Sequence, residues 1–309
     1  MNPYRHFIPS FVLIFLFGFS TLAAQVISDD SLAVAPGESL LTMQKDTIAI
    51  DTVIIKKKPE LIPPKLNVTA FDIGEKLIFK IRYGFIKAGN AEMKVMKKTR
   101  LRGREVYHLQ TTASSVPFFD AFYKVRDEVN SFVAVDGFYS LRFEKKLREG
   151  DYYVDQFVDY YQEDSLAVLE FIRYEDSDLN IRDRKQKDMT VPPFINDILS
   201  SFYYVRNLDL QVGKSVYISN HEKDKVYDLE IKVYKKETID VEAGEFRCIV
   251  VEPLLKGEGI FKQDGRLKIW LTDDDKKIPV QMKTKIAIGS LTTELIKIEG
   301  VRGKISAKE

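Results

Sequence analysis

The chain has 309 residues, of which 45% are hydrophobic and 30% are charged, an ordinary composition for a globular protein. Its 47 Lys and Arg residues balance 46 Asp and Glu residues, so the formal net charge is +1. This balance argues against a general nucleic-acid binder, which would carry a strong basic excess.

The first 24 residues have the layout of a secretory signal peptide. Arg5 and His6 give a basic start, the apolar run 11–19 follows, and Ala23 and Ala24 offer small residues for cleavage. The apolar run is shorter than the roughly 20 residues that a membrane-spanning helix needs. We therefore expect an exported protein that keeps no membrane span, and a periplasmic location if the cell has two membranes.

The single cysteine, Cys248, lies far from the expected cleavage site. A lipoprotein signal needs a cysteine directly after that site, so we expect a soluble protein and not a lipoprotein. One cysteine also excludes an internal disulfide. Because Cys248 shares one face of a predicted strand with Phe246 and Val250, we interpret it as a buried structural residue and not as a reactive thiol.

Residues 25–66 are predicted to be a flexible tether, because their short apolar stretches lack helical periodicity and partner strands. From about residue 70 hydrophobic residues alternate with polar ones, which is typical of half-buried antiparallel strands. Turn signals such as Arg102-Gly103-Arg104 separate these segments. The pattern predicts strands at 77–83, 91–95, 139–143, 152–161, 166–174, 225–236, 245–255, 265–272, 278–288 and 290–298.

One segment departs from this alternation. After Pro192 and Pro193, apolar residues recur every three or four positions, which predicts a helix over 194–206. The expected fold is all-β and mainly antiparallel: a long curved sheet, or open half-barrel, with this helix packed on its concave face. We expect a single β-rich domain over 67–302 and a short C-terminal tail at 303–309.

The sequence offers few candidates for catalysis or metal binding. His108 lies on a predicted strand and His221 in a predicted hairpin turn, and neither has the partners of a metal or nucleophile site. The run 273–275 contains three aspartates, but it lacks the ligand spacing and the glycine of a calcium loop, so we interpret it as a charged turn. We predict no catalytic residue, no cofactor and no metal.

Aromatic residues are abundant, with 20 Phe and 15 Tyr, and some of them could line a cavity between the sheet and the helix. Plain core packing is the alternative for each of them. Cations on the solvent-facing side of the predicted strands 265–272 and 278–288 could bind an acidic headgroup or glycan. Alternatively, they form an ordinary solvated strand face. The candidate ligand-binding residues are Phe194, Ile198, Phe202, Tyr203, Phe118, Phe122, Trp270, Lys283 and Lys285.

Three stretches form a characteristic combination: 74–91, which opens with Gly-Glu-Lys-Leu; 197–206, which opens with Asp-Ile-Leu-Ser; and 259–280, which contains Ile-Trp-Leu-Thr-Asp-Asp. Their order and spacing resemble the bacterial exported family called domain of unknown function 3108. The resemblance covers about residues 70–300. It implies an envelope location and an all-β domain with a central helix. By analogy with half-barrel carriers of lipoproteins, it also implies a greasy concavity for acyl chains. The family offers no established catalytic residues.

The leading hypothesis is a non-catalytic periplasmic protein that binds or carries a lipid, an acyl chain or another hydrophobic or amphipathic envelope molecule. One alternative is a structural or interaction module in envelope assembly, with an exposed sheet edge that recruits a protein partner. Another is a glycan-acting enzyme, for which Asp151, Asp155 and Asp159 could pair as acid and base.

Overall fold

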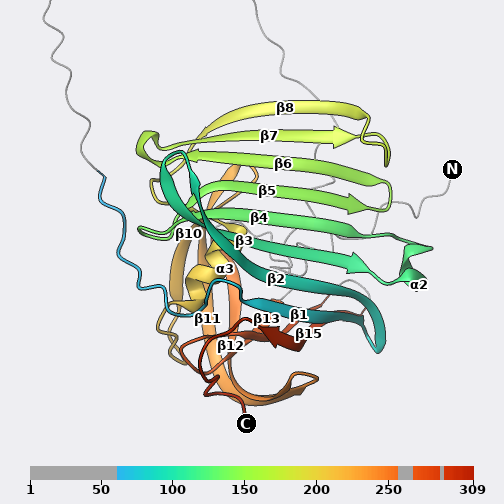
Figure 1. The fold of residues 1–309 in the computed structure, drawn as a ribbon, viewed down its shortest axis with the longest axis vertical. Coiled ribbons are helices and arrows are strands. Elements are labelled where there is room, and N and C mark those ends of the chain that lie inside the picture. Colours follow the sequence, from blue (N-terminus) through green and yellow to red (C-terminus); the bar gives the residue numbers. More distant parts are fainter. Residues whose placement is uncertain (1–60, 257–266, 286–288) are drawn as a thin grey trace, which may run out of the picture.

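A computed structural model describes residues 61–256, 267–285 and 289–309 (Figure 1). The predicted signal peptide, and the predicted tether up to residue 60, lie outside the described residues. The strands form one sheet in the order β8-β7-β6-β5-β4-β3-β2-β1-β15-β14-β13-β12-β11-β10-β9. Every neighbouring pair of strands is antiparallel except β9 and β10, which are parallel.

The strands are β1 (Lys76–Tyr83), β2 (Ile86–Leu101), β3 (Arg104–Ser115), β4 (Arg126–Ala134), β5 (Ser140–Glu149), β6 (Tyr152–Tyr161), β7 (Leu166–Tyr174), β8 (Ile181–Thr190), β9 (Asn196–Asp197), β10 (Val216–Glu222), β11 (Lys225–Val241), β12 (Gly244–Lys256), β13 (Leu267–Thr272), β14 (Pro279–Lys285) and β15 (Ser290–Glu299). The helical elements are α2 (Pro117–Asp120), the short 3-10 helix η2 (Gln162–Asp164) and α3 (Ile198–Arg206).

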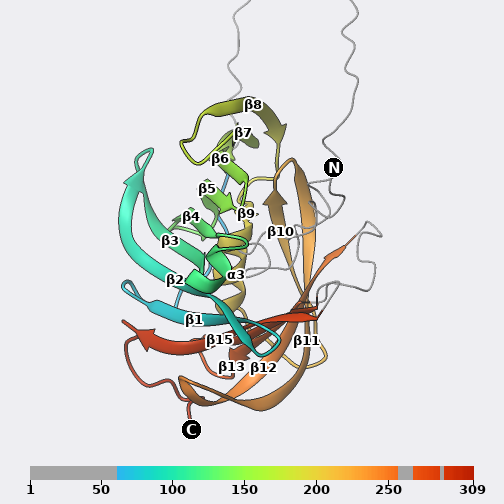
Figure 2. The ribbon, with the colours of Figure 1, turned by 90° about the vertical axis from the view of Figure 1, so that its right-hand side faces the viewer.

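The predicted fold class is confirmed: the described chain is mostly β, in one curved sheet with α3 on its concave side. Alternation in β1 shows how the sequence builds this shape, because Phe79 and Ile81 are buried whereas Lys80 and Arg82 are only half-buried. In Figure 2, α3 lies between the β2–β5 part of the sheet and the strands β10–β12. No helix of the described residues is long and apolar enough to cross a bilayer.

The helix prediction over 194–206 is right at its C-terminal end and wrong at its start. The α3 helix begins at Ile198, because Asp197 caps it: one carboxylate oxygen accepts hydrogen bonds from the backbone N–H groups of Leu199 and Ser200, at 2.9 and 2.8 Å. The other oxygen accepts from Ser131 and Ser140, at 2.5 and 2.6 Å. Before the helix, Phe194 lies in a turn, and Asn196 and Asp197 form the short strand β9, which pairs with β10 instead of forming a first helical turn.

The C-terminal end of α3 is fixed by a buried ion pair. The guanidinium of Arg206 donates to both carboxylate oxygens of Glu75, at 2.7 and 2.8 Å, and to the carbonyl oxygen of Ala70 at 2.9 Å. Both charged side chains are fully excluded from solvent. Breaking one partner of such a pair leaves an uncompensated charge, so the pair locks the helix against the start of β1.

The sheet is curved so strongly that strands far apart in the strand order contact each other across its concave side. Lys145 on β5 lies 2.9 Å from a carboxylate oxygen of Glu222 on β10. The hydroxyl of Tyr160 on β6 lies 3.0 Å from Nδ1 of His221 on β10. These two contacts hold β10 against β5 and β6.

The placement of His221 corrects the prediction that it lies in a hairpin turn. His221 is the penultimate residue of β10 and is almost fully buried, and the turn is made by Lys223 and Asp224. Burial lowers the pKa of His221 to about 4, although the carboxylates of Glu222 and Asp224 act in the opposite direction. The imidazole is therefore a neutral part of the interior.

The last residues of the chain pack onto the sheet. Ala307 is fully buried, and its backbone N–H donates to Asp274 at 3.2 Å. The second oxygen of Asp274 accepts from the hydroxyl of Thr272 and the N–H groups of Lys276 and Lys277. The carboxylate of Asp274 therefore organises a turn and holds the C-terminal segment.

Candidate binding surface

The predicted cavity residues on α3 belong to the packed interior. Ile198, Phe202 and Tyr203 are all buried in the main hydrophobic core. Phe194 lies apart from them, because it precedes β9 with a positive φ of 60° and packs edge-on against Tyr139, with ring centroids 5.1 Å apart. The four residues therefore do not face a common space.

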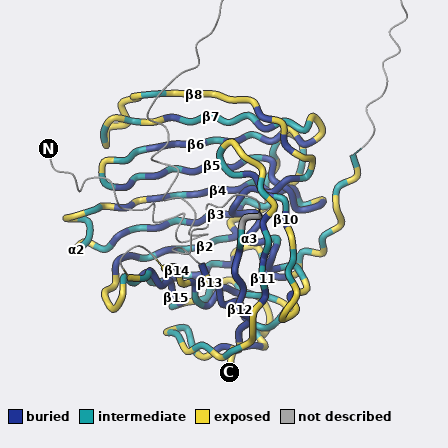
Figure 3. The backbone as a smooth tube through the Cα atoms, turned by 180° about the vertical axis from the view of Figure 1, so that it is seen from behind, coloured by how far each residue is buried: buried dark blue, intermediate teal, exposed yellow. Residues whose placement is uncertain are grey.

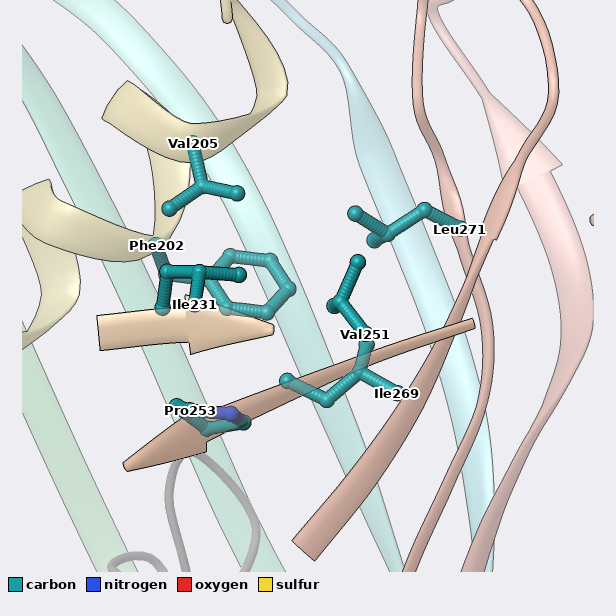
Figure 4. Close-up of a pocket in the computed structure, with 7 residues that line it drawn as sticks. All are labelled: Phe202, Val205, Ile231, Val251, Pro253, Ile269 and Leu271. Atoms are coloured by element: carbon teal, nitrogen blue, oxygen red, sulfur yellow. The ribbon is translucent and has the colours of Figure 1, made fainter. Parts of the chain in front are cut away.

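A small apolar cavity lies beside α3 (Figure 4). Its volume is about 10 Å³, which is room for about one water molecule. An acyl chain does not fit in it. The residues that line it are Phe202, Val205, Ile231, Val251, Pro253, Ile269 and Leu271.

Trp270 and the candidate lysines lie on the opposite face of the sheet from this cavity. Ile269 and Leu271 line the cavity, so Trp270 between them points to the outer face, where its ring nitrogen donates to Glu237 at 2.7 Å. Lys283 is exposed on the same outer face, one strand away. These cations cannot meet the head of a ligand held beside Phe202.

A second candidate surface is formed where several turns meet at one end of the sheet. The start of β2 lies beside the end of β3, because the N–H of Val116 donates to the carbonyl oxygen of Ala88 at 3.0 Å. The β1–β2 turn lies beside the start of β15, because the N–H of Gly84 donates to the carbonyl oxygen of Ser290 at 3.2 Å. Figure 1 shows this end at the right, where α2 and the β1–β2 turn project beyond the sheet.

Large apolar side chains project from these turns into solvent. Phe85, in the β1–β2 turn, and Ile86, the first residue of β2, are 99% and 56% exposed; Phe118 and Phe122, in and after α2, are 66% and 76% exposed. The rings of Phe118 and Phe122 pack against each other with centroids 5.7 Å apart. We call these four residues the apolar rim.

The α2 part of the apolar rim is held in place by an ion pair. Arg126 donates to both oxygens of Asp120, at 3.1 and 2.6 Å, and the hydroxyl of Ser115 also donates to Asp120. The hydrogen bonds from Arg126 and Ser115 hold the pKa of Asp120 below its ordinary value. The N–H of Val125 donates to the same serine at 2.8 Å. The exposed rings therefore stand on a hydrogen-bonded base.

Exposed cations surround the apolar rim. Lys87 follows Ile86 directly, and Lys124 lies two residues after Phe122. Lys285 pairs in register with Ser290, the residue that contacts Gly84. Lys283 lies two residues before it on β14. All four lysines are exposed.

Two of the three carboxylates proposed for glycan chemistry, Asp155 and Asp159, are paired with arginines, whereas Asp151 is exposed in the β5–β6 turn. Asp155 lies 2.7 Å from Arg148, and Asp159 lies 2.7 Å from Arg142 and 3.3 Å from Arg102. Asp155 and Asp159 therefore serve as partners of arginine side chains in this structure. Among the described residues, no three His, Cys, Asp or Glu side chains form a group that could hold a metal ion.

Comparison with known proteins places the chain in a family. Residues 78–296 match the family described as protein of unknown function (DUF3108). The chain belongs to this family. The resemblance that the sequence motifs indicated is thereby confirmed. No curated protein matches this DUF3108 protein significantly.

Matches among solved structures include three bacterial proteins. A β-barrel-like protein of domain of unknown function DUF1849 from Brucella abortus is 10% identical, with a TM-score of 0.48, and the match covers 76% of this chain and 100% of that one. A Bacteroides fragilis protein with a YmcC-like fold is 10% identical, with a TM-score of 0.34 and coverages of 76% and 100%. A Chlamydia trachomatis protein is 7% identical, with a TM-score of 0.30 and coverages of 77% and 92%.

The structure of this DUF3108 protein divides the nine candidate residues among three places. Phe118, Phe122, Lys283 and Lys285 lie at the turn end of the sheet; Ile198, Phe202, Tyr203 and Trp270 belong to the main hydrophobic core; Phe194 packs against a second, smaller cluster. Phe85 and Ile86 were not among the candidates predicted from the sequence. Their signal was present, because two apolar residues follow Gly84 in a turn, where a polar residue is usual.

Proposed function

We propose that this DUF3108 protein is a non-catalytic protein of the cell envelope that binds a lipid or another amphipathic envelope molecule through its apolar rim. The observation that carries the proposal is the exposure of Phe85, Phe118 and Phe122 at one end of the sheet. Single exposed apolar residues are ordinary, but large apolar side chains gathered at one place mark interaction sites. The signal-like residues 1–24 support an envelope location.

The proposal assigns binding to the rim and not to the interior. The cavity beside α3 has a volume of about 10 Å³, so an acyl chain would have to displace packed core side chains there. The rim needs no such rearrangement, because its side chains are already in solvent.

Vesicle co-sedimentation tests the proposal. The exported protein should bind phosphatidylcholine vesicles, and Phe118→Ser/Phe122→Ser should lose about tenfold or more in affinity for each ring removed, since burying a phenylalanine is worth about 1.5–3 kcal/mol. The matched control is Tyr161→Ser, which removes a partly exposed ring at the end of β6 that lies away from the apolar rim. Equal binding by both variants would contradict the proposal.

A second candidate function is recruitment of a protein partner at β8. β8 is an edge strand of the sheet, paired only with β7 in the strand order, and nearly all its residues are exposed (Figure 3). An edge strand offers unpaired backbone groups to another chain, although charges such as Arg184 and Lys185 also discourage such pairing. A photocrosslinker at position 185 should give one defined protein adduct under this function and none under the first.

A further inference from the structure

We propose that the apolar rim and its four lysines dock the protein, with the turn end of the sheet foremost, onto the surface of an anionic lipid bilayer. This inference rests on the proposed function and names the form of lipid that the rim engages. The aromatic side chains would enter the interface between headgroups and acyl chains, and Lys87, Lys124, Lys283 and Lys285 would meet the headgroups.

The lysines around the rim differ from other lysines on the same outer face. Farther from the rim, Lys76 lies 3.1 Å from Glu92, Lys80 lies 3.3 Å from Glu242, and Lys235 lies 2.6 Å from Glu237. Several lysines on this face are therefore neutralised by a neighbouring acid.

Within the described part of the chain, no ion pair involves any of the four lysines at the rim: Lys87, Lys124, Lys283 and Lys285. The chain as a whole is almost neutral, with a formal net charge of +1, so these cations are a local excess. A local excess of exposed lysine attracts an anionic surface.

The acidic residues at this end of the sheet set the orientation of docking. Asp120 is neutralised by Arg126. Exposed acids follow at the neighbouring turns, with Asp151 between β5 and β6 and Asp178 between β7 and β8. The cationic part of the end is thus the side of β14, β15 and β1–β3. We infer that this side approaches the bilayer and that the β7–β8 turn tilts away from it.

The combination of rings and cations favours a bilayer over a soluble acidic polymer. An acidic glycan or peptide would use the lysines but would leave Phe85, at the tip of its turn, in water. A bilayer surface satisfies both kinds of side chain, because it presents anionic headgroups directly above apolar chains. Aromatic residues with neighbouring cations are the side chains that lie at this boundary in membrane-bound proteins.

The experiment compares vesicles of phosphatidylcholine with vesicles that also contain phosphatidylglycerol. The exported protein should bind the anionic vesicles more tightly, and added salt should reduce that difference. Lys283→Gln/Lys285→Gln should lose about 25-fold in affinity for the anionic vesicles, about fivefold for each lysine, with little change on the neutral ones. The matched control is Lys97→Gln/Lys214→Gln, which neutralises two exposed lysines away from the rim.

The outcomes separate this inference from the proposed function. If binding depends on Phe118 and Phe122 but is equal for neutral and anionic vesicles, the docking on anionic lipid is overturned and the proposed function stands. If neither vesicle is bound, both fail. If heparin, used as a soluble acidic polymer, is bound with the same dependence on Lys283 and Lys285 and without need of the rings, the bilayer is the wrong partner.

Discussion

The interior around α3 and the apolar rim use the same kinds of residue in opposite ways. In the interior, Phe202 is buried in the main hydrophobic core and lines a cavity of only about 10 Å³. At the rim, Phe118 packs against Phe119 and Phe122, and the side chains of Phe118 and Phe122 are mostly exposed to solvent. Because folding stability comes from the first region and gains little from the second, the rim is the place where aromatic side chains are free to serve binding.

The sharpest test of this difference is a pair of alanine substitutions. Phe202→Ala should lower the free energy of unfolding by about 3–5 kcal/mol. The substitution removes a buried ring and leaves a cavity that the surrounding side chains fill only partly. Phe85→Ala should change it by less than about 0.5 kcal/mol, because the side chain is exposed in a turn. Urea denaturation measures both values. A large loss for Phe85→Ala would show that the rim is part of the core.

A second test uses the neutral imidazole in the interior. The pKa of His221 is about 4 in the folded chain and near 6.5 in an unfolded one, so the unfolded chain binds more protons between these values. The free energy of unfolding should therefore be highest above about pH 6.5 and should fall by roughly 3 kcal/mol as the pH drops to 4.

The control for the acid effect is His221→Gln, which keeps a polar group near the hydroxyl of Tyr160 but cannot titrate. Its unfolding free energy should change less with pH over the same range. If the two proteins have parallel pH profiles, another group is responsible. Binding to vesicles through the rim should be unaffected by the substitution.

The smallest expected effect concerns the base of α2. Asp120→Asn removes the charge that Arg126 and Ser115 bind, and it should leave global stability almost unchanged because the pair is exposed. Local order should drop instead, with faster hydrogen exchange at the N–H groups of Phe122 and Tyr123, which bond to Phe119. Unchanged exchange there would show that the ion pair does not hold the rim.

Much of the fold could be predicted from the alternation of residues, and the exceptions have physical causes. Strands such as β1 bury one face, so their sequence alternates and their position is readable. The edge strand β8 buries almost nothing, so its charged sequence carries no alternation and it was not predicted. His221 was assigned to a turn because the partner that explains its burial, Tyr160, lies 61 residues away.

The sequence suggested which kinds of side chain could bind a ligand, but it did not show where the structure places them. Aromatic side chains and cations were identified as binding residues, yet the sequence does not show that Phe202 fills the interior while Phe118 stays in water. Both lie near prolines and other aromatics. Only the pairing of distant strands decides it, because that pairing brings the turns after β1, β3 and β14 to one end of the sheet.

The position of β1 in the sheet delays the completion of folding. β1 lies between β2 and β15, and Phe79 is opposite Leu295 in the register. The centre of the sheet therefore joins segments that are synthesised at opposite ends of the domain, and such long-range contacts make folding slow. Until β15 has been synthesised, β1 keeps an open edge.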